Sequence, residues 1–154
     1  MSSDPVFRRR RIVAERHIDG LGHVNNTVWV RFVVELADAH AEAVGMGFLK
    51  TRRDFGAQWI VRRHEIDYLR AAVAGEELLE ETWVESLRGA RSVRRTRFTR
   101  CSNGEACVLA RTEWAFVTAE ALRPLRVPSP IADAFPVVYE PESPHRAAPS
   151  SAKD

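Results

Sequence analysis

The stretch that decides the fold starts with His-Ile-Asp-Gly-Leu-Gly-His-Val-Asn-Asn at residues 17–26 and continues as an apolar segment to Gly45. The first part is polar and contains two glycines, which is typical of a loop. In the second part, residues 27–44, the polar side chains recur at spacings of four, three and four. This spacing places them on one stripe of a helix with 3.6 residues per turn. They are Arg31, Glu35, Asp38 and Glu42.

The predicted helix is apolar around most of its circumference, so we expect other structure to enclose it. Both of its ends are chemically marked. Asn25 or Asn26 is suited to be the N-cap, because a short side-chain oxygen can accept from a free amide of the first turn. Gly45 is suited to the position just after the helix.

Length and composition indicate one globular domain. The chain has 154 residues, of which 29% are charged and 45% hydrophobic, with a formal net charge of +2. Such a chain can bury one core and is too short for two ordinary domains. Lys50 and Lys153 are the only lysines among 23 basic residues. Arginine suits phosphates and carboxylates, but a GC-rich genome gives the same bias, and we favour that explanation.

The sequence predicts a cytoplasmic protein. No apolar run approaches the ~20 residues that span a bilayer, and the N-terminus lacks the apolar segment of a signal peptide. A two-residue turn at Asn103-Gly104 would pair Cys101 with Ala106 and Arg100 with Cys107. The two sulfurs would then point to opposite faces, so we expect free thiols, as is usual in the cytosol, and no zinc site.

The rest of the chain predicts an antiparallel sheet that needs a cover. Residues 106–118 alternate with period two, so that every second side chain from Ala106 to Phe116 shares one face. The long helix is the element able to cover that face. We expect strands at 7–18, 58–69, 78–87, 92–101 and 106–118, an irregular segment or short helical turn at 46–56, and a short helix at 129–135. The expected limits are a tail at 1–6, a domain at 7–140 and a disordered tail rich in Pro, Ser and Ala at 141–154.

The segment Asp-Gly-Leu-Gly-His-Val-Asn-Asn at 19–26, followed by Trp29, Arg31-Phe32 and Glu35, resembles the 4-hydroxybenzoyl-CoA thioesterase-like branch of the hotdog-fold acyl-CoA thioesterases. The order of elements agrees over about residues 7–135. The resemblance implies an α+β hotdog fold, in which a curled antiparallel β-sheet is wrapped around one long central α-helix. It also implies hydrolysis of an acyl-CoA or acyl-carrier-protein thioester without a metal or organic cofactor.

In that family the residue at the position of Asp19 is the catalytic carboxylate, and the backbone N–H at the position of Asn26 polarises the thioester carbonyl. The chemistry is sensible, because an amide at a helix N-terminus is aimed at the negative charge that develops on the oxygen. The carboxylate can attack directly or activate a water. The sequence favours neither route.

Other residues of this stretch carry open roles. Many relatives have an acid where this chain has His17, whose own charge would change the basicity of Asp19. His23 and Asn25 are substrate-binding candidates, although His23 can equally hold the loop and Asn25 can serve only as a cap. Glu35 lies within reach of Arg31 at i, i+4, so we interpret it as structural and keep it as a reserve catalytic carboxylate.

The resemblance also predicts a phosphate site and an oligomer. Related enzymes hold the nucleotide of CoA between their third and fourth strands, where this chain has Arg88, Arg91 and Ser92. Hotdog subunits usually join edge to edge, with each active site at the shared interface, so we expect a homodimer or homotetramer. Trp59, Trp83 and Trp114 are candidates for cover by a partner.

Two other functions stay open. A hotdog protein can bind acyl thioesters without hydrolysis or act as an enoyl-CoA hydratase or dehydratase, for which His23 is available. A nucleic-acid-binding module would use the arginines, but strand alternation places them on both faces, which argues against one basic patch, so we expect no nucleic-acid partner. Because no apolar run is long enough to span a bilayer, we expect no membrane partner either. The acyl group is not readable from the sequence. The arginines in question are Arg8 to Arg11, Arg94, Arg95, Arg97 and Arg100.

Overall fold

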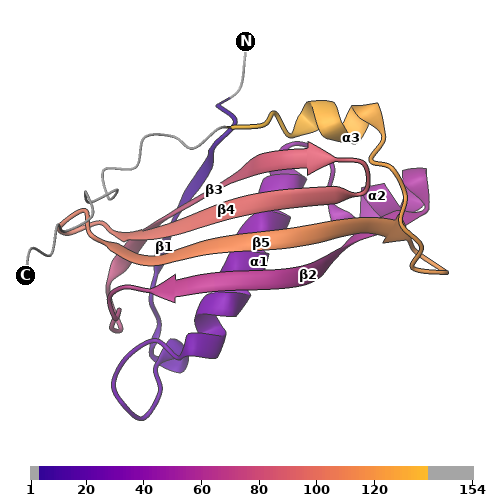
Figure 1. The fold of residues 1–154 in the computed structure, drawn as a ribbon. Coiled ribbons are helices and arrows are strands. Elements are labelled where there is room, and N and C mark those ends of the chain that lie inside the picture. The colour runs from indigo at the N-terminus through magenta and orange to yellow at the C-terminus, as the bar shows by residue number, and fades with distance from the viewer. Residues whose placement is uncertain (1–3, 139–154) are drawn as a thin grey trace, which may run out of the picture.

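The computed structural model describes residues 4–138, which form an antiparallel sheet, a long helix and several short helical segments (Figure 1). The predicted tail 141–154 lies outside the described residues, and the domain limits at 7 and 140 stay a prediction. The strands are β1 (Phe7–Ile12), β2 (Ala57–Tyr68), β3 (Glu77–Arg88), β4 (Arg91–Arg100) and β5 (Ala106–Thr118). The helical segments are η1 (Glu15–His17), α1 (Asn26–Ala43), α2 (Phe48–Phe55) and α3 (Ser129–Ala134).

The five strands pair in the order β1-β3-β4-β5-β2, and each neighbouring pair is antiparallel. The long helix α1 lies across one face of this sheet (Figure 1). The predicted fold class, a curled antiparallel sheet around one long helix, is therefore confirmed. The order also leaves β1 and β2 as the two edges of the sheet.

Both ends of α1 lie where the sequence predicts. Asn25 is the N-cap, and its Oδ1 accepts a hydrogen bond from the Thr27 N–H at 2.9 Å. Gly45 follows the last turn with a φ of +76°, a left-handed conformation that side-chain-bearing residues rarely adopt. The stripe residues Arg31, Asp38 and Glu42 are exposed, as expected. The buried side of α1 consists of Val28, Trp29, Phe32, Val33, Leu36, Ala37 and His40.

An aromatic cluster fixes the N-terminal half of α1 against the sheet. Trp29, Phe32 and Phe98 are all buried, and the ring centroids of Trp29 and Phe98 lie 5.3 Å apart. The Phe32 ring lies 5.8 Å from Trp29 and 6.3 Å from Phe98. Aromatic side chains bury large apolar areas and prefer such tilted contacts. The cluster therefore holds the start of α1 in a fixed position.

The first strand is shorter than predicted. β1 ends at Ile12 instead of residue 18, and the chain turns through η1. The Ala14 N–H donates to His17 Nδ1 at 2.9 Å, which closes this turn. Val13 and His17 are both buried, and a continuous strand could not have turned the segment back toward α1. In residues 46–56 the helical alternative is confirmed, because α2 has eight residues.

The β4–β5 hairpin has a different register from the predicted one. Phe98 lies opposite Val108, and Thr99 lies opposite Ala106. The predicted pairing of Cys101 with Ala106 is wrong, and it would have placed Phe98 opposite Leu109. The observed register buries both Phe98 and Val108. Core packing thus decides the register, because a one-residue slip turns a side chain to the other face.

The two cysteines are free, with Cys101 exposed and Cys107 buried. Among residues 4–138, α1 and the shorter helices lack the length and apolar character needed to cross a membrane.

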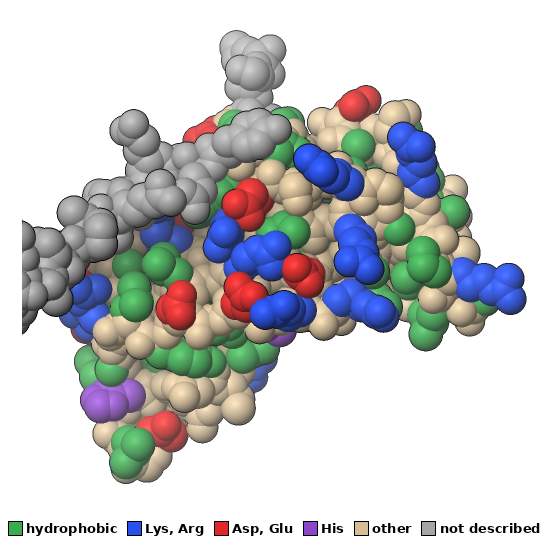
Figure 2. Space-filling model, viewed as in Figure 1, with side chains coloured by type: hydrophobic (Ala, Val, Ile, Leu, Met, Phe, Trp, Pro, Cys, Tyr) green, Lys and Arg blue, Asp and Glu red, His purple; other side chains and the backbone are tan. Residues whose placement is uncertain are grey.

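The basic run of β1 is matched by acids on the neighbouring strand. Arg9 donates to Glu80 at 2.6 Å, and Arg10 pairs with Glu77 at 2.5 Å. Arg8 pairs with Glu81, and Arg11 with Glu80. On the outer face of the sheet, acidic and basic side chains are interspersed (Figure 2). The arginines on this face therefore do not form one basic patch.

A polar centre interrupts the core beneath the C-terminal half of α1. His40 and Arg94 are both buried, and the Arg94 Nη1 donates to His40 Nδ1 at 2.8 Å. Because guanidinium only donates, His40 accepts at Nδ1 and is neutral. Burial, with a further contribution from the Arg94 charge, lowers the pKa of His40 to about 3.

Stability is expected to fall on mild acidification because of this histidine. An unfolded His40 takes up a proton near its ordinary pKa of 6.5, whereas the folded one does so only near 3. Its contribution is therefore complete above 6.5 and decreases through the window down to about 3, by at most ~1.4 kcal/mol per pH unit. Urea unfolding at pH 7.5, 6.5 and 5.5 measures this slope. His40→Gln should flatten it, the exposed His23→Gln should not, and an unchanged slope in His40→Gln would contradict the assignment.

Candidate active site

The loop between η1 and α1 is closed by its own backbone. Ile18 and Val24 form an isolated antiparallel bridge. The Asp19 N–H donates to the His23 carbonyl at 2.9 Å, and the Gly22 N–H donates to the Asp19 carbonyl at 3.1 Å. Gly22 has a φ of +82°, where a side chain would be strained. The sequence therefore folds this polar segment into a tight turn that holds Asp19 beside the start of α1.

One of the two oxygens of the Asp19 carboxylate is hydrogen-bonded to the loop. Its Oδ1 accepts the Leu21 N–H at 2.8 Å, an Asx turn that fixes the side chain. Within residues 4–138, its second oxygen, Oδ2, accepts no hydrogen bond. Asp19 is thus positioned by the backbone and keeps one oxygen for chemistry.

Among residues 4–138, the first turn of α1 has one amide without an acceptor. The Asn25 side chain accepts the Thr27 N–H, and the Asn25 carbonyl accepts the Val28 N–H at 2.9 Å. Within the described part of the chain, the N–H of Asn26 has no acceptor. Free amides at a helix N-terminus carry partial positive charge and attract anions. The Asn26 N–H is therefore the available donor for a developing negative oxygen.

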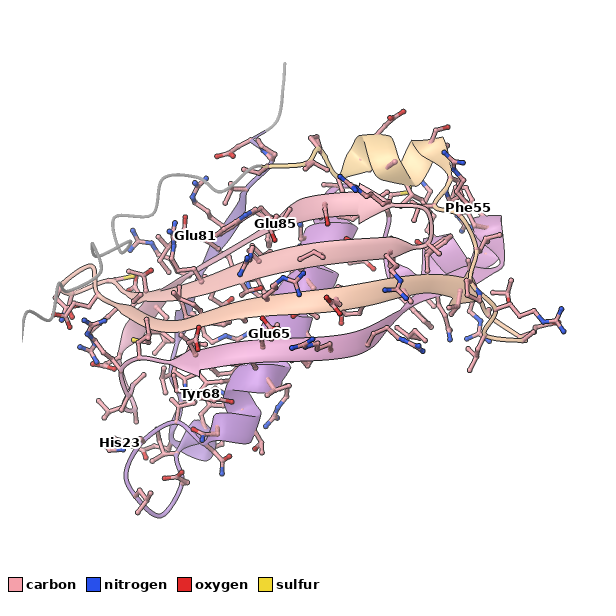
Figure 3. The ribbon with its side chains drawn as sticks, in the orientation of Figure 1. His23, Phe55, Glu65, Tyr68, Glu81 and Glu85 are labelled. Atoms are coloured by element: carbon pink, nitrogen blue, oxygen red, sulfur yellow. The ribbon has the colours of Figure 1, made fainter. Side chains whose placement is uncertain are left out.

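These groups line one open groove of about 410 Å³. Asp19, His23, Asn25 and Asn26 form one wall, so the structure brings together the four site residues predicted for this stretch. The other wall comes from the end of β2 and the segment after it. There the Tyr68 hydroxyl donates to the Asn26 carbonyl at 3.3 Å, and Figure 3 shows Tyr68 and His23 at this end of the molecule. The residues of this second wall are Tyr68, Leu69, Arg70 and Ala71.

The second wall is not apparent from the sequence. Residues 58–69 were expected to form a strand, but nothing local in that pattern indicates that its end lies against the loop at 19–26. The one available signal was Tyr68, because a tyrosine at a strand end combines an apolar ring with a hydroxyl that seeks a partner. In the described residues, no group of three or more His, Cys, Asp or Glu side chains is placed to hold a metal ion.

The ring of His17 packs against α1. Its ring packs edge-on against Phe32 at 4.8 Å and accepts the Ala14 N–H at Nδ1. Burial, followed by the charges of nearby arginines, lowers its pKa below the ordinary value. His17 is therefore neutral at pH 7 and belongs to the core, while its carbonyl accepts the Asn25 N–H at 3.0 Å and so supports the helix cap.

Glu35 has a different partner from the expected one. Arg11 Nη2 donates to Glu35 Oε2 at 2.8 Å, which ties α1 to β1, and no ion pair joins Glu35 to Arg31 in the described residues. Arg11 also pairs with the buried Glu80. This engagement in a structural ion-pair network favours the structural interpretation over the reserve catalytic one.

The predicted phosphate residues lie at the opposite end of the sheet. Arg88 and Arg91 flank the β3–β4 turn, whereas the Asp19 loop lies beyond the other end of β3 (Figure 1). β3 has 12 residues, and a strand of that length spans roughly 36 Å. Arg91 and Ser92 line a second groove of about 420 Å³ together with Arg62. The structure thus does not bring these residues to Asp19 within one chain, and their role stays a prediction.

Comparison with known proteins places this geometry in a family context. The sequence profile of the acyl-ACP thioesterase N-terminal domain matches residues 4–135. No curated protein matches the sequence significantly.

Solved structures of similar fold include several thioesterases. A substituted 4-hydroxybenzoyl-CoA thioesterase in complex with 4-hydroxybenzoyl-CoA has a TM-score of 0.80 at 16% identity, over 86% of this chain and 100% of that one. A 1,4-dihydroxy-2-naphthoyl-CoA thioesterase from Synechocystis has 0.77 at 16%, over 84% and 94%. An acyl-ACP thioesterase from Bacteroides thetaiotaomicron has 0.77 at 21%, over 92% and 58%. At such identities the likeness shows the fold.

Proposed function

The chain belongs to the acyl-ACP thioesterase family and is a thioesterase of the hotdog fold, and on this premise we propose that it cleaves an acyl-CoA or acyl-carrier-protein thioester in the groove between Asp19 and the N-terminus of α1. One observation carries the proposal. A carboxylate oxygen of Asp19 and the N–H of Asn26, both without a partner in the described residues, line the same groove. These are an anionic group and a donor, the pair that thioester hydrolysis needs.

The Asn26 N–H is the proposed oxyanion donor. Attack on a thioester carbonyl places negative charge on its oxygen. An amide already fixed at a helix N-terminus stabilises that charge without the free-energy cost of reorienting solvent. The aromatic cluster beneath α1 keeps this amide in place. The role uses the backbone alone, so the side chain of Asn26 has no part in it.

Asp19 is the proposed nucleophile or general base. As a nucleophile, its free oxygen forms an anhydride with the acyl group and expels the thiolate, and water then releases the acid. As a base, it removes a proton from the attacking water. The hydrogen bond from Leu21 fixes the carboxylate for either route. His23 and Asn25 are proposed to contact the substrate from the same wall.

We further propose a dimer joined through β2, acting in the cytoplasm. β2 is an edge strand, and an isologous antiparallel pairing across a two-fold axis would place the Tyr68 end of one protomer beside the Ala57 end of its partner. The groove of Asp19 would then lie near the partner's groove that contains Arg62 and Arg91. This arrangement would unite the catalytic loop with the phosphate-binding arginines, which one chain keeps apart.

A complementation assay tests both parts of this proposal. Asp19→Asn and Arg62→Glu/Arg91→Glu are co-expressed with different tags, purified through both tags and assayed for thiol release on the best substrate of an acyl-CoA panel. In a shared-site dimer, one of the two sites contains Asp19 from one chain and both arginines from the other. We therefore expect the heterodimer to be far more active than either variant alone.

The controls separate the possible failures. Each variant co-expressed with itself under the two tags gives the baseline, and light scattering gives the mass of the 17.4 kDa chain in solution. A heterodimer no more active than its parents would contradict the shared site. A fully active Arg62→Glu/Arg91→Glu homodimer would refute the phosphate role, and a monomeric mass would refute the dimer.

A further inference from the structure

A small, partly open cavity lies away from the groove of Asp19. Its volume is about 60 Å³, and it lies between the C-terminal half of α1, the sheet and the end of α3. This is room for about two water molecules, or for one group of three or four heavy atoms. Its walls are largely apolar and include Trp59, Val84, Leu87 and Phe135. The same cavity is lined by Arg94, which gives it a positive charge.

Within the described residues, Arg94 is a buried cation without an acidic partner at contact distance. It is 6% exposed, and its two hydrogen bonds, to His40 Nδ1 at 2.8 Å and Thr82 Oγ1 at 3.1 Å, both use Nη1. Nε and Nη2 make no hydrogen bond within residues 4–138. Other arginines of β4 differ, since Arg95 pairs with Glu85 and Arg97 with Glu81. Burial lowers the pKa of Arg94 to about 10, so it still carries its charge at neutral pH.

A second donor without a partner in the described residues belongs to Trp114, which lines this cavity and also the groove that contains Arg62 and Arg91. The indole Nε1 of Trp114 is buried and has no hydrogen-bond partner in the described residues. Trp114 lies opposite Ser92 in the β4–β5 ladder, and the Ser92 side chain also lines the cavity. A buried donor without an acceptor costs free energy comparable to a lost hydrogen bond. This buried N–H and the unengaged side of the Arg94 guanidinium belong to residues that line one void, so one anionic acceptor there would complete both.

Asp38 is the one acid among the described residues that line this cavity. Its side chain lines the cavity but is exposed, and it forms no ion pair with Arg94 in the described residues. Partial burial raises the pKa of Asp38, while the Arg94 charge opposes that shift. The neutral His40 supplies no negative charge either. Among residues 4–138, Arg94 therefore has no acid in direct contact, and Asp38 acts on its charge only from a distance. A buried charge without a contacting partner is costly unless a ligand completes it.

We propose that this cavity binds a carboxylate group, held by Nε and Nη2 of Arg94 and by the Trp114 indole N–H. The planar fork of a guanidinium matches the two oxygens of a carboxylate. The apolar walls would receive the carbon atoms attached to it. The carboxylate has two possible sources, a free small carboxylic acid or the distal end of an acyl substrate.

The first arm of the test uses acetate on the unmodified protein. Sodium acetate, compared with sodium chloride at equal ionic strength, is expected to raise the thermal midpoint of unfolding and to shift the Trp114 indole N–H resonance, assigned with Trp114→Phe. Arg94→Gln should abolish both responses. Arg95→Gln is the matched control, because it removes a neighbouring guanidinium from the opposite face of β4 and should keep both responses.

Further variants keep this arm decisive. Arg94→Lys retains the charge but loses the fork, so acetate should bind more weakly than in the parent. Asp38→Asn removes the competing negative charge, so acetate should bind more tightly. If the parent shows no response to acetate, or if only Asp38→Asn responds, the cavity holds water or Asp38 is the counter-ion, and the proposal is wrong.

The second arm asks whether the carboxylate arrives on the acyl group, and it depends on the proposed thioesterase function. Mono-CoA thioesters of dicarboxylic acids are compared with monocarboxylic acyl-CoA thioesters of equal length by thiol release. A preference for the dicarboxylic series that Arg94→Gln reduces about tenfold to a hundredfold would assign the acyl end. Acetate binding without this preference assigns a free carboxylate. Absence of all hydrolysis contradicts the enzyme function and leaves the acetate result standing.

Discussion

Replacement of Asp19 by Asn is expected to lower kcat on the best acyl-CoA substrate about a hundredfold to ten-thousandfold, with little change in the thermal midpoint of unfolding. Asn keeps an oxygen at the position of Oδ1, so it can still accept the Leu21 N–H at the loop turn. It cannot carry the negative charge required of a nucleophile or a base. The substitution therefore separates chemistry from loop structure, which Asp19→Ala would change together.

Thiol release with purified protein measures the effect, with kcat and KM determined separately. Asp54→Asn is the matched control, because Asp54 lies on α2 and pairs with the exposed Arg53 away from the groove. A fall in kcat with KM nearly constant is the expected pattern for a group that acts on the reacting atoms. Activity of Asp19→Asn within a few-fold of the parent would rule out both proposed routes.

The sequence predicted the elements best where local chemistry and burial agree. Asn25 caps the start of α1 and Gly45 follows its last turn. Because helix caps act over only a few residues, a local sequence pattern identifies both helix ends. The register of the β4–β5 hairpin depends instead on which side chains meet in the core. The contact of Phe98 with α1 overrides the turn preference of Asn103-Gly104, and no local pattern contains that information.

The candidate site divides in the same way. Its first wall, from Asp19 to Asn26, is contiguous in sequence. The motif there points to Asp19, His23, Asn25 and Asn26, but not to Leu21 or Val24, which also line the groove. Its second wall comes from Tyr68 and the residues after it, which only the tertiary fold brings across the groove. The separation of Asp19 from Arg91 along the sheet is likewise not apparent from the sequence. It follows from strand length, and it is the reason for proposing that two chains share each site.

The polar centre of the core was missed for a different reason. Arg94 lies between other arginines in the sequence, and alternation predicts only that it points to the opposite face from Arg95. Its partner His40 interrupts the apolar face of α1 without a pattern that marks it. These two residues are 54 positions apart in the chain. Only the structure shows that one arginine of this group is buried without an acid.

Phe32→Ala is expected to lower the free energy of unfolding by about 3–5 kcal/mol. Phe32 is 1% exposed, and its ring contacts Trp29, Phe98 and His17. The Arg11 guanidinium also lies 3.9 Å above the ring, so the substitution removes a cation–π contact as well as apolar burial. Urea unfolding followed by tryptophan fluorescence measures the change. A domain of this size is stabilised by about 5–15 kcal/mol in total, so the loss is a large share.

Phe48→Ala is the matched control, because it deletes the same atoms from an exposed position on α2 and should change stability by about 0.5 kcal/mol or less. If Phe32→Ala is too unstable to purify, Phe32→Leu keeps part of the ring volume and should give a smaller loss in the same direction.

Phe32 also supports His17, whose carbonyl accepts the Asn25 N–H at the helix cap. We therefore expect folded Phe32→Leu to release thiol more slowly than Phe48→Ala. Equal stability of the two alanine variants would mean that the aromatic cluster does not anchor α1, and the fixed position of the Asn26 amide would lose its physical basis.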